Sequence, residues 1–283
     1  MPAKSISELQ NLAPQIRRDI LRMVHACQSG HPGGSLGCVE YFIALYGQEM
    51  NHNPDFQMDG IGEDLCFLSN GHISPLWYST LARFGYFPIE ELGTFRKLNS
   101  RLQGHPATHE HLPGIRIASG SLGQGLSVAI GAAQTKKLNG DKSTIYVLMG
   151  DGEQQEGQVW EAAMYAPHNK VDNLIATIDY NGQQIDGPVN AILNLLNLKA
   201  KYEAFGWIVL DLEDGNNLES VLTTFKQAKS LLGNGKPVMV LMKTEMGFGV
   251  DFMMHSHKWH GVAPNDEQLA AALGQLPSEL VDY

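Results

Sequence analysis

Two stretches of this chain, TIYVLMGDGEQQEG at 144–157 and LIATIDYNGQQIDG at 174–187, decide its fold. The apolar run 144–149 is typical of a buried parallel strand, and the Gly-Asp-Gly after it permits a tight turn and a close approach to a ligand. Residues 157–169 carry apolar side chains at helical spacing, and 174–178 is a second buried strand. Together these segments predict a β-α-β unit.

Asp151 and Asn181 each come just after one of these two strands. Open α/β sheets bind ligands at the carboxyl ends of their strands, and a carboxylate with an amide oxygen suits Mg²⁺ or Ca²⁺. The amides of the Gly150–Gly152 turn and of the helix that follows could face phosphate groups. The alternative interpretation of Asp151 alone is a simple helix cap.

The rest of the chain alternates strands and helices in the same way, which predicts an α/β fold with a doubly wound parallel sheet and helices on both faces. No repeat, low-complexity stretch or linker divides the sequence, so we expect one domain over residues 1–283. The predicted strands are 64–69, 144–149, 174–178, 207–212 and 237–243. The predicted helices are 7–28, 36–47, 73–84, a helix that ends near 138, 157–169 and 218–232, with one or two short helices within 188–206.

Composition narrows the functional classes. The chain has 283 residues, 43% of them hydrophobic and 18% charged, which is typical of a globular protein. A formal net charge of −10 argues against a nucleic acid or an anionic membrane as partner. Cys27, Cys38 and Cys66 show no metal-binding spacing, and the first residues lack the apolar core of a signal peptide. We therefore expect a cytoplasmic protein with reduced thiols.

Further motifs, in the same order along the chain, identify a family. GDGEQQEG, the following strand and NGQQIDG resemble the thiamine-diphosphate motif of transketolases, and the resemblance covers the amino-terminal part of a one-piece enzyme of this family. The other motifs that carry it are SGHPGG at 29–34, LSNGH at 68–72, QGHP at 103–106, SGSLGQG at 119–125 and WHG at 259–261.

The resemblance implies a binding site for thiamine diphosphate and Mg²⁺ or Ca²⁺. The implied metal ligands are Asp151, Asn181 and Gln183, the last through its backbone carbonyl. Ser121 stands where many one-piece transketolases carry proline, and this difference keeps the SGSLGQG loop small. The implied cofactor-binding residues are His72, Gly120, Ser121, Leu122, Gly150, Asp151, Gly152, Glu153, Asn181, Ile185 and His260.

Four histidines are implied near the reacting carbons, where they would contact oxygens and move protons near neutral pH. Simpler interpretations of two of them stay open: His31 could be a turn residue without a function, and His72 could be a histidine that is hydrogen-bonded to the backbone. The implied catalytic residues are His31, His72, His105, His260, Glu156 and Glu161. The two glutamates match family residues at a subunit interface, and plain surface charge is their alternative.

Several residues depart from the family pattern or lack a role. His105, His109 and His111 cluster in a long loop, as in some zinc sites, but no cysteine or acidic spacing supports zinc. Arg116 stands where many members have an acidic residue. His257 is a weaker alternative to His260, and His255 has no assigned role.

The resemblance also implies a missing half. The family's second domain binds the pyrimidine ring of the cofactor and supplies the activating glutamate and most residues that hold the substrate's phosphate. We therefore expect a two-chain transketolase, a heterotetramer that transfers a two-carbon ketol unit from a ketose, which is a sugar phosphate or a related anionic sugar, to an aldose. The alternatives are a subunit related to deoxyxylulose-phosphate synthase or to 2-oxo-acid dehydrogenases, and a cofactor-binding chain without a catalytic partner.

Overall fold

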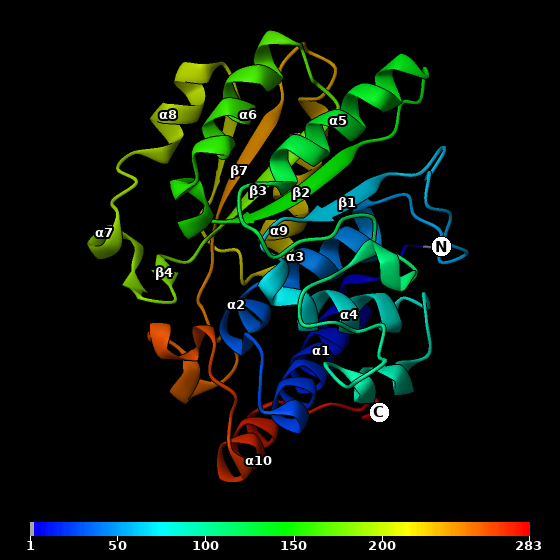
Figure 1. Ribbon diagram of the computed structural model, residues 1–283, viewed down its shortest axis with the longest axis vertical. Coiled ribbons are helices and arrows are strands. Elements are labelled where there is room, and N and C mark those ends of the chain that lie inside the picture. The colour runs from blue at the N-terminus through cyan, green and yellow to red at the C-terminus, as the bar shows by residue number, and fades with distance from the viewer. Residues whose placement is uncertain (1–2) are drawn as a thin grey trace.

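Five parallel strands form the central sheet of this computed structural model, which describes residues 3–283 (Figure 1). Their order across the sheet is β1-β2-β3-β7-β6. The strands are β1 Leu65–Leu68, β2 Ile145–Gly150, β3 Leu174–Tyr180, β6 Ile208–Leu212 and β7 Val238–Lys243. Gly150 pairs with Asp179, and Tyr180 pairs with Lys243. The carboxyl ends of three neighbouring strands therefore meet at one edge, as the motif positions predicted.

The strands are buried because their sequences are apolar on both faces. Every residue of β1 is buried, and so are 145–149 of β2 and 174–179 of β3. Parallel strands with helices on both sides require such continuous apolar runs. The five predicted strands are confirmed, with ends that differ by one or two residues.

Helices cover both faces of the sheet. In Figure 1, α5, α6 and α8 lie in front of the sheet, and α3 and α9 lie behind it. The helices are α1 Ile6–Cys27, α2 Pro32–Gly37, α3 Val39–Ala44, α4 Ser74–Arg83, α5 Gly125–Leu138, α6 Gly157–His168, α7 Val189–Ile192, α8 Leu198–Phe205, α9 Leu218–Ser230 and α10 Asp266–Gln275. Within residues 3–283, no helix is both long and apolar enough to cross a bilayer.

The predicted helix 36–47 is three shorter elements. Pro32 occupies the first turn of α2, a position where its missing N–H costs nothing, so the helical segment starts earlier than predicted. Cys38 interrupts it, and α3 continues into the π-helix η1, Leu45–Glu49. Gly47 lies against α1, since a Cβ there would be 2.5 Å from a methyl carbon of Leu9. The early start places His31 directly before a helix.

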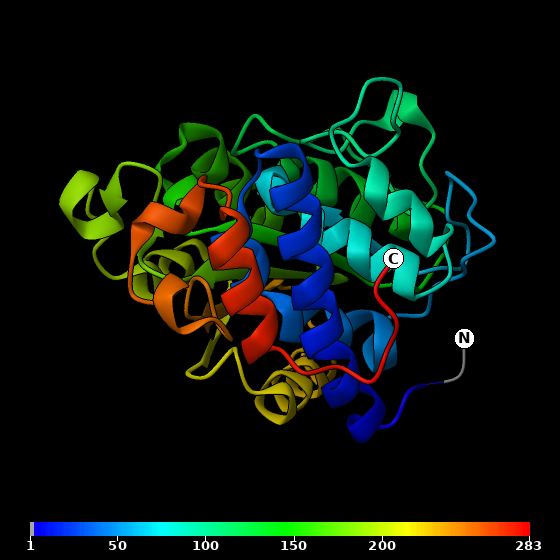
Figure 2. The ribbon, with the colours of Figure 1, turned by 90° about the horizontal axis from the view of Figure 1, so that it is seen from below.

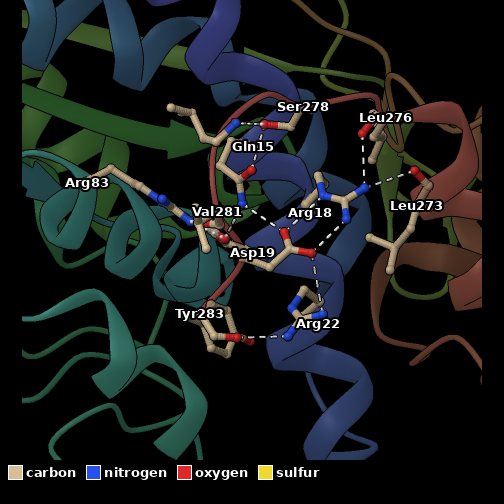
Figure 3. Close-up of polar contacts among 12 residues, drawn as sticks. Gln15, Arg18, Asp19, Arg22, Arg83, Leu273, Leu276, Ser278, Val281 and Tyr283 are labelled. Atoms are coloured by element: carbon tan, nitrogen blue, oxygen red, sulfur yellow. Dashed lines mark hydrogen bonds and ion pairs between the residues drawn. The ribbon is translucent and has the colours of Figure 1, made fainter.

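The end of the chain packs on its beginning. Figure 2 shows α10 beside α1 and the final residues running back along α1 toward α4. Arg18 forms an ion pair with Asp282 at 2.7 Å. In Figure 3, Nη2 of Arg22 donates to the backbone carbonyl of Tyr283 at 2.8 Å. Because α10 follows the WHG motif and α1 precedes the SGHPGG motif, this contact holds the two motifs in one body. No sequence pattern predicted α10.

Candidate functional site

Asp151 and Asn181 come together at the carboxyl edge of the sheet. Asp151 is 1% exposed, and its Oδ2 accepts a hydrogen bond from the amide of Gly182 at 2.6 Å. Its Oδ1 accepts from the amide of Gly152 at 2.7 Å. The loop after β3 is therefore bonded to the turn after β2 through the Asp151 carboxylate.

Asp179 is a buried third member of this edge that the sequence analysis missed. Its carboxylate accepts from Nδ2 of Asn181 at 2.8 Å and from the hydroxyl of Thr244. Because Nδ2 is held by Asp179, Oδ1 of Asn181 is directed away from that carboxylate, where it accepts the amide of Gln183 at 2.9 Å. Asp179 thus fixes which face of the Asn181 amide carries the oxygen.

The two buried carboxylates repel each other. Burial raises the pKa of Asp151 to about 7, and the negative charge of Asp179 contributes to the rise. Burial also raises the pKa of Asp179, although Thr244, Cys38 and Asn181 oppose it with hydrogen bonds. A cation beside Asp151 would offset this repulsion, and the oxygen donors at hand are those that Mg²⁺ and Ca²⁺ prefer. The chemistry of this edge fits a divalent metal.

Glu153 holds the turn from inside. Its carboxylate accepts from the hydroxyl of Ser69, from the amide of Gly123 at 2.8 Å and from the amide of Gly150 at 3.0 Å. It is 1% exposed, and burial raises its pKa. The side chain thereby joins the end of β1, the SGSLGQG loop and the end of β2. Its contact with a cofactor stays a prediction.

The four histidines of separate motifs form one cluster. The ring centroid of His31 lies 5.2 Å from that of His72, 5.9 Å from that of His105 and 5.6 Å from that of His260. The rings of His72 and His260 are 4.9 Å apart. Residues up to 229 positions apart in sequence are thus gathered around one point.

Burial keeps these histidines neutral. It lowers the pKa of His31 to about 4, with help from the charges of His260 and His105. Burial likewise lowers the pKa of His72, His105 and His260. Each ring therefore offers one donor and one acceptor nitrogen near neutral pH, the state suited to exchange protons with hydroxyl and carbonyl oxygens.

The SGSLGQG loop lies between the histidines and the sheet edge. A Cβ on Gly120, whose φ is +143°, would be 3.3 Å from the His105 ring. Gly71 lies close to Ser119, because a Cβ there would be 2.2 Å from the serine hydroxyl. Ser121 is exposed and Leu122 is half-buried. The loop thus combines tight packing on one side with access for a ligand on the other.

The cluster and the sheet edge are connected by the hairpin of β4, Gln183–Gln184, and β5, Gly187–Pro188. Ile185 at its tip is 60% exposed, and its Cδ1 would lie 3.6 Å from a Cβ at Gly261. The hairpin therefore reaches from Asn181 to the WHG motif.

Several buried polar atoms of these motifs have no hydrogen-bond partner within residues 3–283. Such atoms are costly unless a ligand or water satisfies them. They are Nδ1 of His31, Oδ1 of Asn70, Oγ of Ser119, Oε1 of Gln183 and Nδ1 of His260. Their concentration in the motifs fits a polar ligand such as a diphosphate cofactor.

Other candidates lie elsewhere. His109 and His111 are exposed, and His255 lies 3.1 Å from a carboxylate oxygen of Glu245. Arg116 stacks on Phe56 and forms an ion pair at 3.5 Å with Glu63, in the loop before β1. It therefore holds that loop. Within residues 3–283, no three His, Cys, Asp or Glu side chains converge as a metal site by themselves.

The catalytic glutamates predicted from the resemblance, Glu156 and Glu161, are both exposed. Glu156 precedes α6 and Glu161 lies within it. The side chains of Val128, Met164 and Tyr165 on α5 and α6 are also exposed, by 41%, 60% and 48%. This surface thus mixes carboxylates with large apolar side chains.

Comparison with known proteins gives the family. The family model described as transketolase, thiamine diphosphate binding domain, matches residues 9–279. The chain belongs to the transketolase family. This confirms the family and the fold class that the sequence predicted.

Two relatives of this transketolase-family chain are of similar length. It is 39% identical over 275 residues to a 6-deoxy-6-sulfo-D-fructose transketolase subunit of Clostridium sp. (strain MSTE9), covering 96% of this chain and 97% of that protein. It is 38% identical over 276 residues to an apulose-4-phosphate transketolase subunit of Actinobacillus succinogenes, covering 97% and 98%.

Solved transketolases are longer. The crystal structure of transketolase from Campylobacter jejuni superposes with a TM-score of 0.88 at 34% identity, covering 99% of this chain but 44% of the other. A transketolase of Pichia stipitis gives a TM-score of 0.88 at 30% identity and 42% coverage. The chain thus spans less than half the length of the solved transketolases that it matches.

Proposed function

We propose that this chain is the amino-terminal subunit of a two-chain transketolase, which transfers a two-carbon ketol unit from an anionic ketose to an aldose. The observation that carries the proposal is the cluster of four neutral histidines beside an edge that fits a divalent metal. Relatives of matching length are named as subunits of transketolases for a sulfonated and a phosphorylated sugar, which supports an anionic substrate.

Asp151, Asn181 and the backbone carbonyl of Gln183 would hold Mg²⁺ or Ca²⁺, with diphosphate oxygens and water completing its coordination. Thiamine diphosphate, when bound, supplies the nucleophilic carbon that carries the two-carbon unit. The remaining contacts to the cofactor would come from the glycine turns after β1 and β2, the SGSLGQG loop, Ile185, His72 and His260.

The histidines would act on the sugar. Neutral imidazoles can donate to a carbonyl oxygen and accept a hydroxyl proton without a separate base. Burial lowers the pKa of all four histidines, so each is a weaker base than a free histidine and releases a bound proton more readily. They therefore suit proton exchange that reverses in each half-reaction.

The partner would supply the pyrimidine-binding domain. We propose that residues 1–283 form a single diphosphate-binding domain and that the working form is a heterotetramer. The exposed apolar side chains of α5 and α6, beside Glu156 and Glu161, support a partner surface there. We also propose a cytoplasmic location, which the three unpaired thiols Cys27, Cys38 and Cys66 support.

Cofactor binding tests the metal site. Asp151→Ala should weaken thiamine diphosphate binding in Mg²⁺ by on the order of tenfold or more, measured by calorimetry with the partner present. Asp214→Ala, which removes an exposed carboxylate after β6, is the matched control. Unchanged affinity in Asp151→Ala would remove this residue from the site.

Turnover tests the histidines. His105→Ala and His260→Ala should each lower turnover on the order of 100-fold or more. The melting temperature should stay close to wild type, because His105 lies in a loop, His260 ends a short 3-10 helix, and neither belongs to the apolar core. The control is His111→Ala, because His111 is an exposed histidine of the same loop as His105, and this change should leave turnover unchanged. Full turnover in both site variants would refute their role.

A further inference from the structure

Arg96 differs from every other arginine of this chain. The sequence has seven arginines, and within residues 3–283 six of them form an ion pair with Asp or Glu. The pairs are Arg17–Glu40, Arg18–Asp282, Arg22–Asp282, Arg83–Asp19, Arg101–Glu91 and Arg116–Glu63. Arg96 is partly buried and has no carboxylate partner in the described part of the chain. Partly buried charges are normally paired, so this cation lacks a counter-ion.

The side chain of Arg96 lies between two histidine loops. Its Nη1 donates to the hydroxyl of Ser29 at 3.1 Å, two residues before His31. Its Nη2 makes only a long contact, 3.5 Å, to the carbonyl of Gly104, the residue before His105. Gly104 leaves room for the guanidinium, since a Cβ there would be 2.4 Å from its Cζ.

The donors of Arg96 are far from satisfied. A guanidinium has five N–H groups, and neutral oxygens receive only the two contacts named above. Nε is buried without an acceptor. The backbone at Arg96 has φ +57°, in the left-handed region that is uncommon for residues other than glycine. The local fold thus accepts strain while it holds a cation beside the histidines.

The charge of Arg96 reaches the histidine cluster. It contributes, after burial, to the lowered pKa of His105 and, with His260 and His105, to that of His31. A positive charge without a carboxylate partner in the described part of the chain therefore lies near His31 and His105. An anion bound there would oppose this effect and raise both pKa values.

We propose that Arg96 binds the tetrahedral oxyanion, phosphate or sulfonate, at the far end of the sugar substrate. The inference rests on the proposed function and adds to it a residue of this chain that recognises the substrate's anionic group. Guanidinium groups suit such oxyanions because they donate several hydrogen bonds in a fixed plane. Basic residues of the partner would add to this contact.

A simpler role would be to tie the Ser29 and Gly104 loops together. That role requires no counter-ion, and it predicts that removal of Arg96 impairs every substrate equally and lowers the melting temperature. An anion site instead predicts a loss that depends on the charge of the ligand. The two roles are therefore separable by experiment.

The first test measures anion binding by the chain itself. Sodium sulfate and sodium phosphate are titrated against sodium chloride of equal ionic strength, while the ring protons of His31 and His105 are followed by NMR. We expect saturable shifts in the wild type, at least tenfold weaker binding in Arg96→Gln, partial retention in Arg96→Lys and no change in Arg101→Gln. Arg101 is the matched control because it is paired with Glu91 in a neighbouring segment.

Equal sulfate and phosphate binding by wild type and Arg96→Gln would overturn the proposal, and so would the absence of saturable binding in the wild type. This test needs no catalysis, so it stands apart from the proposed function. If Arg96→Gln does not fold, anion binding is compared between the wild type and Arg96→Lys. We then expect weaker but still saturable binding in Arg96→Lys, because lysine keeps the charge but not the planar set of donors.

The second test uses the two-chain enzyme. Arg96→Gln should raise KM for a phosphorylated or sulfonated ketose on the order of 10- to 100-fold, as expected for a lost charged hydrogen bond, and leave KM for an uncharged ketose unchanged. Comparison of the two anionic sugars shows which oxyanion the site prefers. Equal losses with charged and uncharged ketoses would refute anion recognition. Absence of ketol transfer by the wild type with any sugar would instead reject the proposed function.

Discussion

Lowering the pH from about 7.5 to about 5.5 should weaken the binding of a divalent cation by protonating Asp151. Burial and the charge of Asp179 raise the pKa of Asp151 to about 7 in the folded chain without metal. Its folded pKa therefore exceeds the unfolded value. In the absence of a cation, the contribution of Asp151 to the free energy of unfolding is therefore fully present below the unfolded pKa, near 4. It is lost as the pH rises through the folded pKa of about 7.

The size of the effect follows from that pKa. A cation binds the ionised carboxylate, so binding releases the proton, and each pH unit below about 7 lowers the apparent affinity up to tenfold. For a pKa of about 7, the loss from about pH 7.5 to about pH 5.5 is about 25-fold. The histidines do not obscure this, because burial lowers their pKa and His31 stays neutral down to about pH 4.

The assay is a titration with Mn²⁺, followed by its electron paramagnetic resonance signal, at several pH values. Mn²⁺ takes the same oxygen ligands as Mg²⁺. Asp151→Asn is the control, because its amide does not titrate, and its weaker binding should be nearly independent of pH in this range. An affinity of the wild type that stays constant between about pH 5.5 and about pH 7.5 would refute the placement of the metal at Asp151.

Three further predictions concern the frame of the site. Glu153→Gln should destabilise the chain by about 1–3 kcal/mol in chemical denaturation, since a side-chain amide donor would face a buried backbone N–H, while Glu156→Gln should be neutral. Gly125→Ala should lower the melting temperature, because the new Cβ would lie 2.3 Å from side-chain atoms of Ser69. Gly131→Ala in the same helix is the control: its Cβ meets no atom within 4 Å, so this change should stabilise the chain by about 0.5–1 kcal/mol. The NMR titration of the His31 ring should give a pKa of about 4, and a value near 6.5 would show that the ring is not buried among the other histidines.

The sequence predicted the parts of the structure that depend on local pattern. The apolar runs and the Gly-Asp-Gly turn were sufficient for the five strands and the order of the main helices. The family motifs singled out His31, His72, His105 and His260. In the structure, the ring centroids of the other three histidines each lie within 6 Å of the His31 ring centroid.

The missed features depend on contacts between distant segments. Asp179 reads as an ordinary strand residue until Thr244 and Asn181 are seen around it. The sequence likewise did not show that the Glu153 carboxylate accepts hydrogen bonds from Ser69 and Gly123, which are far away in the chain. A sequence also does not show which arginine lacks an acidic partner. Periodicity therefore gives elements, whereas the partners of polar groups require the fold.

Ketol transfer by the purified chain, with and without its partner, is the measurement that tests the proposed function most directly. Both reactions contain thiamine diphosphate and Mg²⁺, and release of the aldose from an anionic ketose is followed. The partner is a chain that carries a pyrimidine-binding transketolase domain and co-purifies with this one. We expect no transfer from this chain alone and full transfer from the mixture. Full activity of the isolated chain, or none in the mixture, would contradict the two-chain transketolase.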